Sequence, residues 1–511
     1  MKKWLLLIII FLAAVLRLYK LDQVPPSLYW DEASLGYNAY SISQTLRDEH
    51  GNFLPISSFP AFGDYKPIGY IYAAVPFIKL FGLSEVAVRS PSALAGILLV
   101  LVTYFLVKEL LDNRITALLA SLFVAVSPWA IQMSRGAFEA NLATFFSATG
   151  IYLFLKKKRI FSALCFVAAM YTFNSHRVFV PLIIFSLGLI YLKDFKKHLI
   201  FYFLTFILVL PLIPHLISSE GHLRFNEVTW LNDLNIVETA NKNIALNNNA
   251  LWAKVIFNRR IYYTGEFLKH YFDHYRFDFL FQTGDVNPRL SSRTVGEMYL
   301  IDLPLVLLGL FVLIKKRDKT TALIFSWLLL APIPAAFARE TPHALRILNI
   351  LPVPMIIGAV GLVKLPKIFK LLVPFILAFF ILSYLKSYYF IYPVKFAADW
   401  QSGYKQMVQS VAEIQEQYDY VSVTNSLGRP YIYFLFYNQY APQKYWVNRD
   451  ASRDKFGFWT VASFDKYVFS DNISKKGRWL YVRSVTDQIT GKHLVKTVSD
   501  FSGRPVFFLY D

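Results

Sequence analysis

Long apolar runs alternate with short polar connectors along the first three quarters of the chain. The runs are roughly 15–24 residues long, near the length at which a helix crosses the hydrocarbon core of a bilayer. The pattern therefore predicts about eleven membrane-spanning helices. Their expected ranges are 4–19, 84–107, 115–133, 138–155, 160–174, 178–192, 199–217, 299–314, 320–338, 344–363 and 369–391.

One further apolar run, residues 67–82 with the sequence PIGYIYAAVPFIKLFG, is assigned differently. Counting it as a span would reverse the direction of the following helices and move the basic connectors to the other side of the membrane. We therefore expect it to form an interfacial or re-entrant helix.

The distribution of charge fits the same topology. The chain has 511 residues, of which 55% are hydrophobic and only 17% are charged, against about a quarter charged in a typical soluble domain. The formal net charge is +19, and the connectors between the apolar runs hold 18 basic residues but only four acidic ones. Because basic connectors stay on the cytoplasmic side, this charge sets orientation and does not indicate a nucleic-acid partner.

That orientation places the N-terminus inside and two long segments, residues 20–83 and 218–298, outside. From residue 393 the composition changes to that of a soluble α/β domain. A helix is expected over 404–417, and strands over 420–424, 458–464, 479–485 and 506–510. The predicted domains are a membrane domain, residues 1–392, and an exterior domain, residues 393–511.

Ionisable residues gather at the exterior ends of the predicted helices. The stretch YWDEASLGYNAY places Asp31 and Glu32 side by side just after the first span. Each charge alone is explained equally well as an ordinary loop charge or a salt-bridge partner, and Asp31 also as a helix N-cap. Charges near membrane depth are costly without partners or a cavity, so their convergence predicts a site. The other members of the set are Asp64, Lys66, Arg89, Arg135, Glu139, His343 and Arg346.

Several familiar sequence signatures are missing. The chain has no Walker phosphate loop, no H-E-x-x-H, no paired-cysteine metal pattern and no G-x-S-x-G elbow. No two aspartates stand two residues apart, so the D-x-D signature of nucleotide-sugar transferases is also absent.

The order of three segments carries a resemblance to a known family. An acidic pair on the first exterior segment, then GDYKPIGYIY (63–72), then SEVAVRSPSALAG (84–96), resembles glycosyltransferase family 39. The likeness covers residues 1–390, and GDVNPR (284–289) and TPHALRILNILP (341–352) resemble segments of bacterial members. The family includes protein O-mannosyltransferases and the transferase that adds aminoarabinose to lipid A.

The resemblance implies a fold and an activity. We expect an α-helical polytopic membrane protein of the GT-C type, with its active site on the outer face of a bacterial plasma membrane. The expected reaction moves a sugar, with inversion, from a polyprenyl-phosphate donor to a hydroxyl of a protein, lipid or glycan. On transfer the donor phosphate gains negative charge, which fixed cations stabilise.

The acidic residues are expected to serve the acceptor. Asp31 is predicted to be the base that takes the proton of the acceptor hydroxyl. Glu32 is predicted to orient the acceptor or support the loop. Asp64, Arg135 and Glu139 are expected in supporting roles.

The basic residues are expected to serve the donor. Lys66 and Arg89 match family positions that meet the donor phosphate, and His343 and Arg346 are assigned to the same anion by location. In the aminoarabinose transferase a glutamate that helps to hold a metal precedes the Lys-Pro pair, and here Tyr65 stands in its place. The sequence therefore leaves a divalent cation as an open alternative.

Two other functions compete with this prediction. A ligase or polymerase that moves a lipid-linked glycan as a block shares the same fold. A lipid flippase or ion-coupled transporter is the alternative from another class, but many transporters are built from repeated halves with charged residues near the bilayer midplane. No internal repeat is evident here, and the charges lie at one face.

Overall fold

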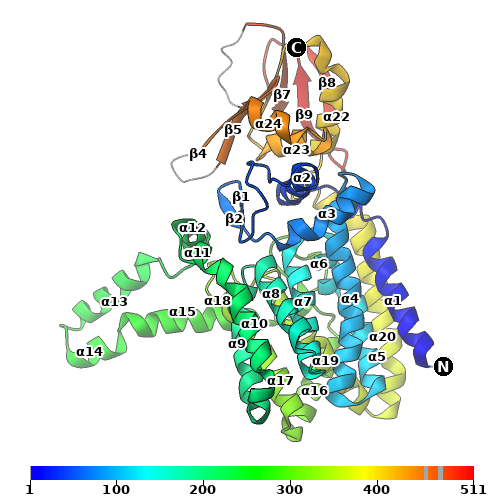
Figure 1. Ribbon diagram of the computed structural model, residues 1–511, viewed down its shortest axis with the longest axis vertical. Helices are drawn as coiled ribbons and strands as arrows, with labels where there is room; N and C mark the ends of the chain where they lie inside the picture. Colours follow the sequence, from blue (N-terminus) through cyan, green and yellow to red (C-terminus); the bar gives the residue numbers. More distant parts are fainter. Residues whose placement is uncertain (1, 454–458, 470–475) are drawn as a thin grey trace. The chain divides into compact units, whose positions relative to one another are not determined.

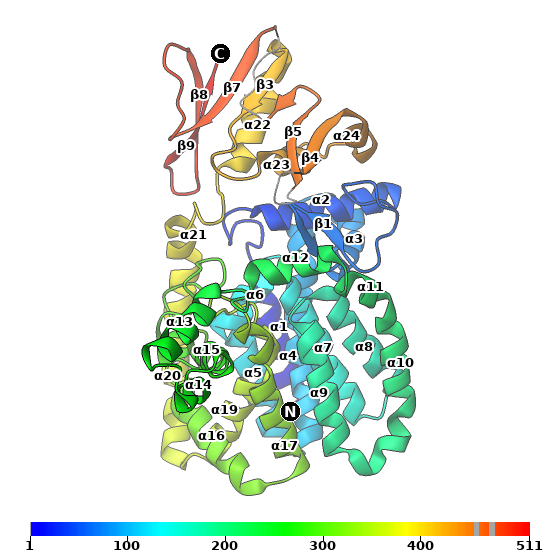
Figure 2. The ribbon, with the colours of Figure 1, turned by 90° about the vertical axis from the view of Figure 1, so that its left-hand side faces the viewer.

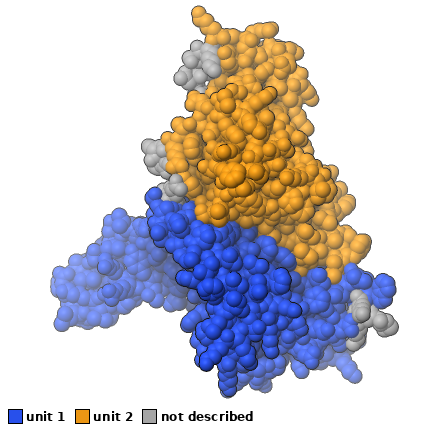
Figure 3. Space-filling model, in the orientation of Figure 1, with its two compact units in different colours: residues 1–9, 99–130, 143–378 blue, residues 10–98, 131–142, 379–511 orange. Residues whose placement is uncertain are grey.

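The computed structural model describes residues 2–453, 459–469 and 476–511 of the chain. Two compact units are distinguished, coloured separately in Figure 3. Unit 1 contains residues 1–9, 99–130 and 143–378, and unit 2 contains residues 10–98, 131–142 and 379–511. This grouping differs from the predicted boundary at residue 392, because residues 20–83 pack with the C-terminal residues.

Unit 1 is helical, and Figure 2 shows α8, α9 and α10 running side by side within it. The helices that lie wholly or largely in this unit are α5 (Arg114–Val126), α7 (Glu139–Leu155), α8 (Arg159–Thr172), α9 (His176–Ile190), α10 (Leu199–Val209), α11 (Ile213–Leu216), α12 (Ser219–Val228), α13 (Leu234–Leu246), α14 (Leu251–Ile256), α15 (Arg259–Asp273), α16 (Asp302–Lys316), α17 (Lys319–Leu330), α18 (Ile333–Ala336) and α19 (Val353–Lys364).

Unit 2 combines helices with two sheets. Helices α4 (Glu85–Leu111) and α20 (Lys367–Lys386) run across the division between the units, as does the start of α1. The remaining helices are α1 (Lys2–Leu18), α2 (Trp30–Thr45), α3 (Gly69–Phe81), α6 (Pro128–Arg135), α21 (Tyr392–Lys395), α22 (Tyr404–Ile414), α23 (Pro430–Tyr437) and α24 (Pro442–Asn448).

Helices long and apolar enough to cross a membrane are present, which confirms the multi-pass prediction. Among the described residues there are four, and a fifth if the bent pair α5–α6 counts as one span; the four are Glu85–Leu111, Leu192–Leu216, Lys319–Ala336 and Lys367–Lys395. Other predicted spans correspond to shorter apolar helices, so the count of eleven is not confirmed. The shorter apolar helices are Trp4–Leu18, Gly69–Phe81, Arg159–Thr172, His176–Ile190 and Leu348–Lys364.

The predicted span over 115–133 is not one straight helix. Its two segments, α5 and α6, meet at Ser127 with a bend of 54°. Pro128, the first residue of α6, has no backbone N–H to continue the hydrogen bonds of α5, and its ring disfavours a helical residue before it. A helix is found in the region of residues 67–82: α3 ends at Phe81, and its C-cap Gly82 has a φ of +69°. Its interfacial or re-entrant placement stays a prediction.

The described C-terminal residues form a mixed sheet of seven strands in the order β4-β5-β6-β3-β7-β9-β8. Strands β4, β5, β7, β8 and β9 are labelled in Figure 1. Strand β3 pairs in parallel with β6 and β7, and the other pairs are antiparallel. All four expected strands and the expected helix are found, although residue 458 lies outside the described range. The strands are β3 (Tyr420–Val423), β4 (Arg449–Arg453), β5 (Trp459–Phe464), β6 (Tyr467–Val468), β7 (Trp479–Ser484), β8 (Leu494–Ser499) and β9 (Pro505–Tyr510).

Helix α2 packs on α23, and this contact joins the segment after α1 to the C-terminal domain. The Gln401 side-chain oxygen accepts a hydrogen bond from the backbone N–H of Trp30, the first residue of α2, at 3.0 Å. The same oxygen accepts from the Tyr433 hydroxyl at 2.6 Å, and that hydroxyl also lies 3.1 Å from the carbonyl oxygen of Leu28. The start of α2 is therefore fixed by residues that lie 371 to 405 positions later in the chain.

A buried carboxyl group lies in the same interface. Glu49 is 1% exposed, and its carboxylate accepts hydrogen bonds from the Tyr431 hydroxyl at 2.9 Å and the Asn38 amide at 3.1 Å. Burial raises the pKa of Glu49 to about 7, although the hydrogen bond from Tyr431 acts in the opposite direction. Burial lowers the pKa of the adjacent His50 to about 3.

Glu49→Gln is expected to remove one source of pH-dependent stability. Between pH 4.5 and about 7 the folded chain keeps a proton on Glu49 that the unfolded chain has released. Rising pH therefore lowers the free energy of unfolding, by on the order of 3 kcal/mol over this window. The contribution of His50 to the free energy of unfolding rises with pH below its ordinary pKa, opposite to that of Glu49. The test is therefore the difference in the free energy of unfolding between variant and wild type.

Chemical denaturation of the purified protein at several pH values between 5 and 8 measures this difference. E49Q should gain stability relative to wild type as the pH rises. The exposed Glu416 serves as a matched control, and E416Q should leave the difference flat. Parallel curves for E49Q and wild type would show that Glu49 is ionised throughout.

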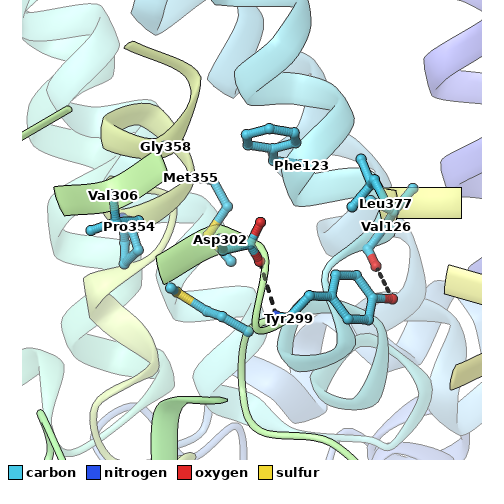
Figure 4. Close-up of a pocket in the computed structure, with 10 residues that line it drawn as sticks. Phe123, Val126, Tyr299, Asp302, Val306, Pro354, Met355, Gly358 and Leu377 are labelled. Carbon is cyan, nitrogen blue, oxygen red and sulfur yellow. Dashed lines mark hydrogen bonds between the residues drawn. The ribbon is translucent and has the colours of Figure 1, made fainter. Parts of the chain in front are cut away.

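A small cavity in unit 1 is too small to hold a sugar. It has a volume of about 10 Å³, room for about one water molecule. Figure 4 shows Asp302 beside it, accepting a hydrogen bond from the backbone N–H of Tyr299 at 2.9 Å. The Tyr299 hydroxyl donates to the carbonyl oxygen of Val126, also at 2.9 Å. We assign these contacts to helix packing.

Candidate active site

The acidic pair stands in the first turn of α2, with Tyr29 as the N-cap residue. The alternative that Asp31 caps the helix is therefore wrong. Consecutive residues of a helix point about 100° apart, so the two carboxylates face different surroundings. The Asp31 side chain is 42% exposed, whereas that of Glu32 is 5% exposed.

Asp31 forms an ion pair with Lys66, with 2.5 Å between the carboxylate oxygen and Nζ. Lys66 ends strand β2 (Asp64–Lys66), which pairs antiparallel with β1 (Phe59–Ala61). Side chains alternate along a strand, so Asp64 and Lys66 share one face of this hairpin. The hairpin thus carries the lysine to the start of α2.

Lys66 is surrounded by carboxylates. Its side chain is 15% exposed. Burial alone would lower its pKa, but the attraction of Asp31, Glu139 and Asp64 outweighs burial and raises the pKa of Lys66. The amine therefore keeps its proton at neutral pH and offers a fixed positive charge at the edge of an acidic cluster.

Glu32 has a full set of partners inside the protein. Its Oε1 accepts from Arg89 Nε at 3.0 Å and from the backbone N–H of Ala137 at 2.8 Å. Its Oε2 accepts from Arg89 Nη2 at 3.0 Å and from the backbone N–H of Tyr29 at 3.1 Å. Of the two roles predicted for Glu32, the geometry favours support of the loop over contact with an acceptor.

Arg89 is fully buried and donates all five of its N–H groups to the protein. Two go to Glu32, as above. The others reach the carbonyl oxygens of Leu21 at 2.9 Å, Pro25 at 3.0 Å and Ser27 at 2.5 Å. This arrangement does not fit the donor-phosphate role predicted for Arg89, because no N–H remains to bind a phosphate. Arg89 instead holds the segment that leads into α2.

Arg135, the last residue of α6, has a similar structural role. It is fully buried and donates to the carbonyl oxygens of Leu16, Tyr19, Lys20 and Val24 at 2.7–3.1 Å. These contacts fix the turn after α1, which agrees with the supporting role predicted for Arg135.

The predicted residues His343 and Arg346 belong to unit 1, whereas the other predicted site residues belong to unit 2. The backbone N–H of Arg346 lies 3.4 Å from His343 Nδ1. Their loop is tied to the GDVNPR segment by Asp285, whose carboxylate accepts from the backbone N–H of Ala344 at 2.6 Å. The phosphate-binding role of both residues stays a prediction.

Two acidic residues of unit 1 were not among the predicted site residues. The backbone N–H of Asp285 donates to the buried Glu297 at 3.0 Å. Burial raises the pKa of Glu297 well above its usual range, and the charge of Asp285 adds to the effect. The GDVNPR stretch pointed to Asp285, but no sequence pattern pointed to Glu297.

The position of Tyr65 does not suit a metal ion. The Tyr65 hydroxyl accepts a hydrogen bond from Arg453 Nη2 at 2.6 Å, and the guanidinium lies 5.9 Å from the centre of the ring. A guanidinium beside a neutral phenol disfavours a second cation. Within the described residues, no group of three or more His, Cys, Asp or Glu side chains is arranged to hold a metal.

A family comparison supports the predicted resemblance. Residues 7–212 match the model described as dolichyl-phosphate-mannose-protein mannosyltransferase. The match includes Asp31, Glu32, Lys66 and Arg89 but ends before the loop with His343. No curated protein matches the chain in a sequence comparison.

The fold is also found in solved structures. ArnT from Cupriavidus metallidurans, bound to undecaprenyl phosphate, is similar with a TM-score of 0.57 at 12% identity, over 98% of this chain and 97% of ArnT. Its apo form gives 0.56 over the same shares. An oligosaccharyltransferase from Archaeoglobus fulgidus gives 0.51 at 13% identity, over 86% of this chain and 61% of its own. The GT-C fold and the family resemblance are thereby confirmed.

Proposed function

We propose that this membrane glycosyltransferase moves a sugar from a polyprenyl-phosphate donor to an acceptor hydroxyl, with inversion, on the outer face of the membrane. The observation that carries the proposal is the pairing of a solvent-accessible carboxylate, Asp31, with a lysine, Lys66, at the start of α2. The carboxylate of the adjacent Glu32 is bound by Arg89, so within the acidic pair Asp31 is the one available for chemistry.

The predicted topology and the comparisons both support a lipid-linked donor. Nucleotide sugars are made in the cytosol, so an outward-facing transferase needs a donor that has crossed the membrane. The similar ArnT structure holds undecaprenyl phosphate, and the matching family is named for a dolichyl-phosphate donor. A polyprenyl phosphate carries the sugar on a lipid tail, so the donor can reach the enzyme within the membrane.

Lys66 is proposed to meet the donor phosphate. When the sugar leaves, the bond between its anomeric carbon and the phosphate oxygen breaks, and the phosphate charge changes from −1 towards −2. A fixed ammonium gains interaction energy as that charge develops, which lowers the barrier. Because the pKa of Lys66 is raised, the ammonium form persists throughout the physiological range.

Asp31 is proposed to act as the base. The acceptor oxygen attacks the anomeric carbon from the face opposite the departing phosphate, and its proton passes to the carboxylate. In the resting protein Lys66 holds Asp31 at 2.5 Å. A donor phosphate competes for the same ammonium, so donor binding weakens the hold on Asp31 and readies it for the proton.

Further residues complete the proposed site. Glu32 and Arg89 form the buried pair that fixes the start of α2, and Asp64 and Glu139 contribute negative potential at Lys66. These four residues position the reacting pair. His343 and Arg346 remain proposed ligands of the donor anion.

Lys66→Ala is expected to lower turnover at saturating donor by roughly 10²-fold or more, as for loss of a single oxyanion donor. The measurement uses the purified enzyme with a polyprenyl-phosphate sugar and follows the sugar transferred. Lys79, an exposed lysine in the last turn of α3, provides a matched control. Lys79→Ala should retain wild-type turnover.

Two results would count against the proposal. Unchanged turnover in Lys66→Ala would assign Lys66 to structure alone. Transfer of a preassembled glycan from a lipid diphosphate, with no reaction of the single-sugar phosphate donor, would favour the ligase or polymerase alternative.

A further inference from the structure

An unusual helical arm extends from unit 1. We call residues 234–273, which contain α13, α14 and α15, the arm. Figure 1 shows it running sideways, at a steep angle to α9, α10 and α17, and Figure 2 views it nearly end-on. The sequence predicted only an exterior loop in this region.

The base of the arm is fixed to one end of a predicted span. His270 Nδ1 lies 2.8 Å from the carbonyl oxygen of Ala338, just beyond α18. The hydroxyl of Tyr271 donates to the carbonyl oxygen of Leu329 at 2.7 Å, near the end of α17. Helix α17 begins at Lys319, beside the basic connector, so the arm leaves from the opposite end of the span. With α17 as a membrane span, an arm that leaves its end at a steep angle would run along the membrane surface.

The far end of the arm exposes apolar side chains on one helical face. In α14 these side chains are at positions i, i+1, i+4 and i+5: Leu251, Trp252, Val255 and Ile256, exposed by 82, 53, 68 and 53%. Helix α15 continues with Ile261, Leu268 and Phe272, each 45% exposed or more. An exposed apolar stripe that includes tryptophan is typical of helices that lie in the membrane–water interface.

The charges at the far end of the arm, around α14, have one sign, whereas the acidic residues Glu238, Glu266 and Asp273 lie nearer its base. Residues 239–265 contain Lys242, Lys254, Arg259 and Arg260 and no acidic residue. All four basic side chains are exposed. Two such surfaces facing each other would bring like charges together, which disfavours a second copy of the chain as the partner. Anionic lipid headgroups offer both the complementary charge and the apolar layer beneath it.

We propose that the arm docks on the headgroup layer of the bilayer, with the apolar residues of α14 at the acyl boundary and the basic residues on anionic phosphates. The proposal is independent of the catalytic assignment. It predicts that the position of the arm depends on lipid charge.

Site-directed fluorescence tests this prediction on the full-length protein. The chain has a single cysteine, Cys165, so Cys165→Ser provides a background for labels at Val255→Cys or, as a second variant, Leu251→Cys. Each protein is placed in nanodiscs of phosphatidylglycerol or phosphatidylcholine, with and without brominated acyl chains. A label at the exposed Gln488 of the C-terminal domain is the control.

We expect the labels at 251 and 255 to lose most of their emission to brominated phosphatidylglycerol and less to brominated phosphatidylcholine, while the Gln488 label is unaffected. The triple variant K254Q/R259Q/R260Q should reduce the loss in phosphatidylglycerol to that in phosphatidylcholine. Labels that stay as accessible to water as the Gln488 label in both lipids would overturn the proposal. Protection that instead rises with protein concentration in lipid-free detergent would identify a second copy as the partner and also overturn it.

Discussion

Replacing Asp31 with asparagine is expected to lower the rate of sugar transfer by roughly 10²–10⁴-fold, the usual cost of losing a general base. Asparagine keeps the size and much of the hydrogen-bonding capacity of aspartate but cannot take the acceptor proton. Because the Asp31 side chain is 42% exposed and caps no helix, folding should be little affected. Turnover and thermal unfolding of the purified variant measure the two effects separately.

The exposed Asp22 on the same segment supplies a control of the same chemistry. Asp22→Asn should transfer sugar at the wild-type rate. If Asp31→Asn also did so, Asp31 would be excluded as the base. Glu139 and Asp64, the other carboxylates that act on Lys66, would then be tested by the same substitution.

Arg89→Met should cost about 3–5 kcal/mol of stability, the loss typical of breaking a buried ion pair on one side. The substitution leaves the Glu32 carboxylate, 5% exposed, without its guanidinium partner. It also removes the donors to the carbonyl oxygens of Leu21, Pro25 and Ser27. Denaturation in detergent or nanodiscs, with turnover measured alongside, checks the prediction.

A double variant makes the test specific. E32Q/R89M should recover some of the lost stability, because no buried charge is left unpaired. The ion pair of Lys496 with Glu413, 2.8 Å long and exposed, is a control, and Lys496→Met should cost at most about 1 kcal/mol. An Arg89→Met protein with wild-type stability but lost turnover would instead restore the donor-phosphate role that the sequence suggested.

The sequence predicted the acidic pair but could not assign different roles to its two residues. Asp31 and Glu32 are adjacent and chemically alike. Their surroundings differ because α2 turns Glu32 toward Arg89 of α4 and Asp31 toward Lys66 of β2. Arg89 was predicted to be a phosphate ligand because the sequence does not show which groups its side chain contacts. The carbonyl oxygens that accept its hydrogen bonds belong to residues 21–27, an irregular segment whose path no sequence periodicity predicts.

The fold was predicted best where a pattern repeats. The amphipathic spacing of 404–417 predicted α22, and runs of β-branched and aromatic residues predicted β3, β7 and β9. Strand β4, with the sequence RDASR, was missed because it alternates no apolar residues and is held by pairing with β5. The helices of the arm were missed because they are short, with 13, 6 and 15 residues, and mix apolar with polar side chains, so none has the pattern of a membrane span.

The contacts at the start of α2 also bear on how this enzyme can be altered. Gln401 and Tyr433 of the C-terminal domain hold Trp30 and Leu28, immediately before Asp31. The C-terminal domain therefore cannot be exchanged between relatives independently of α2. A chimera that imports a foreign domain would also need to import its matching α2 surface, or the carboxylate would be displaced along with the helix. Variation in this domain is constrained by the chemistry of a segment at the other end of the chain.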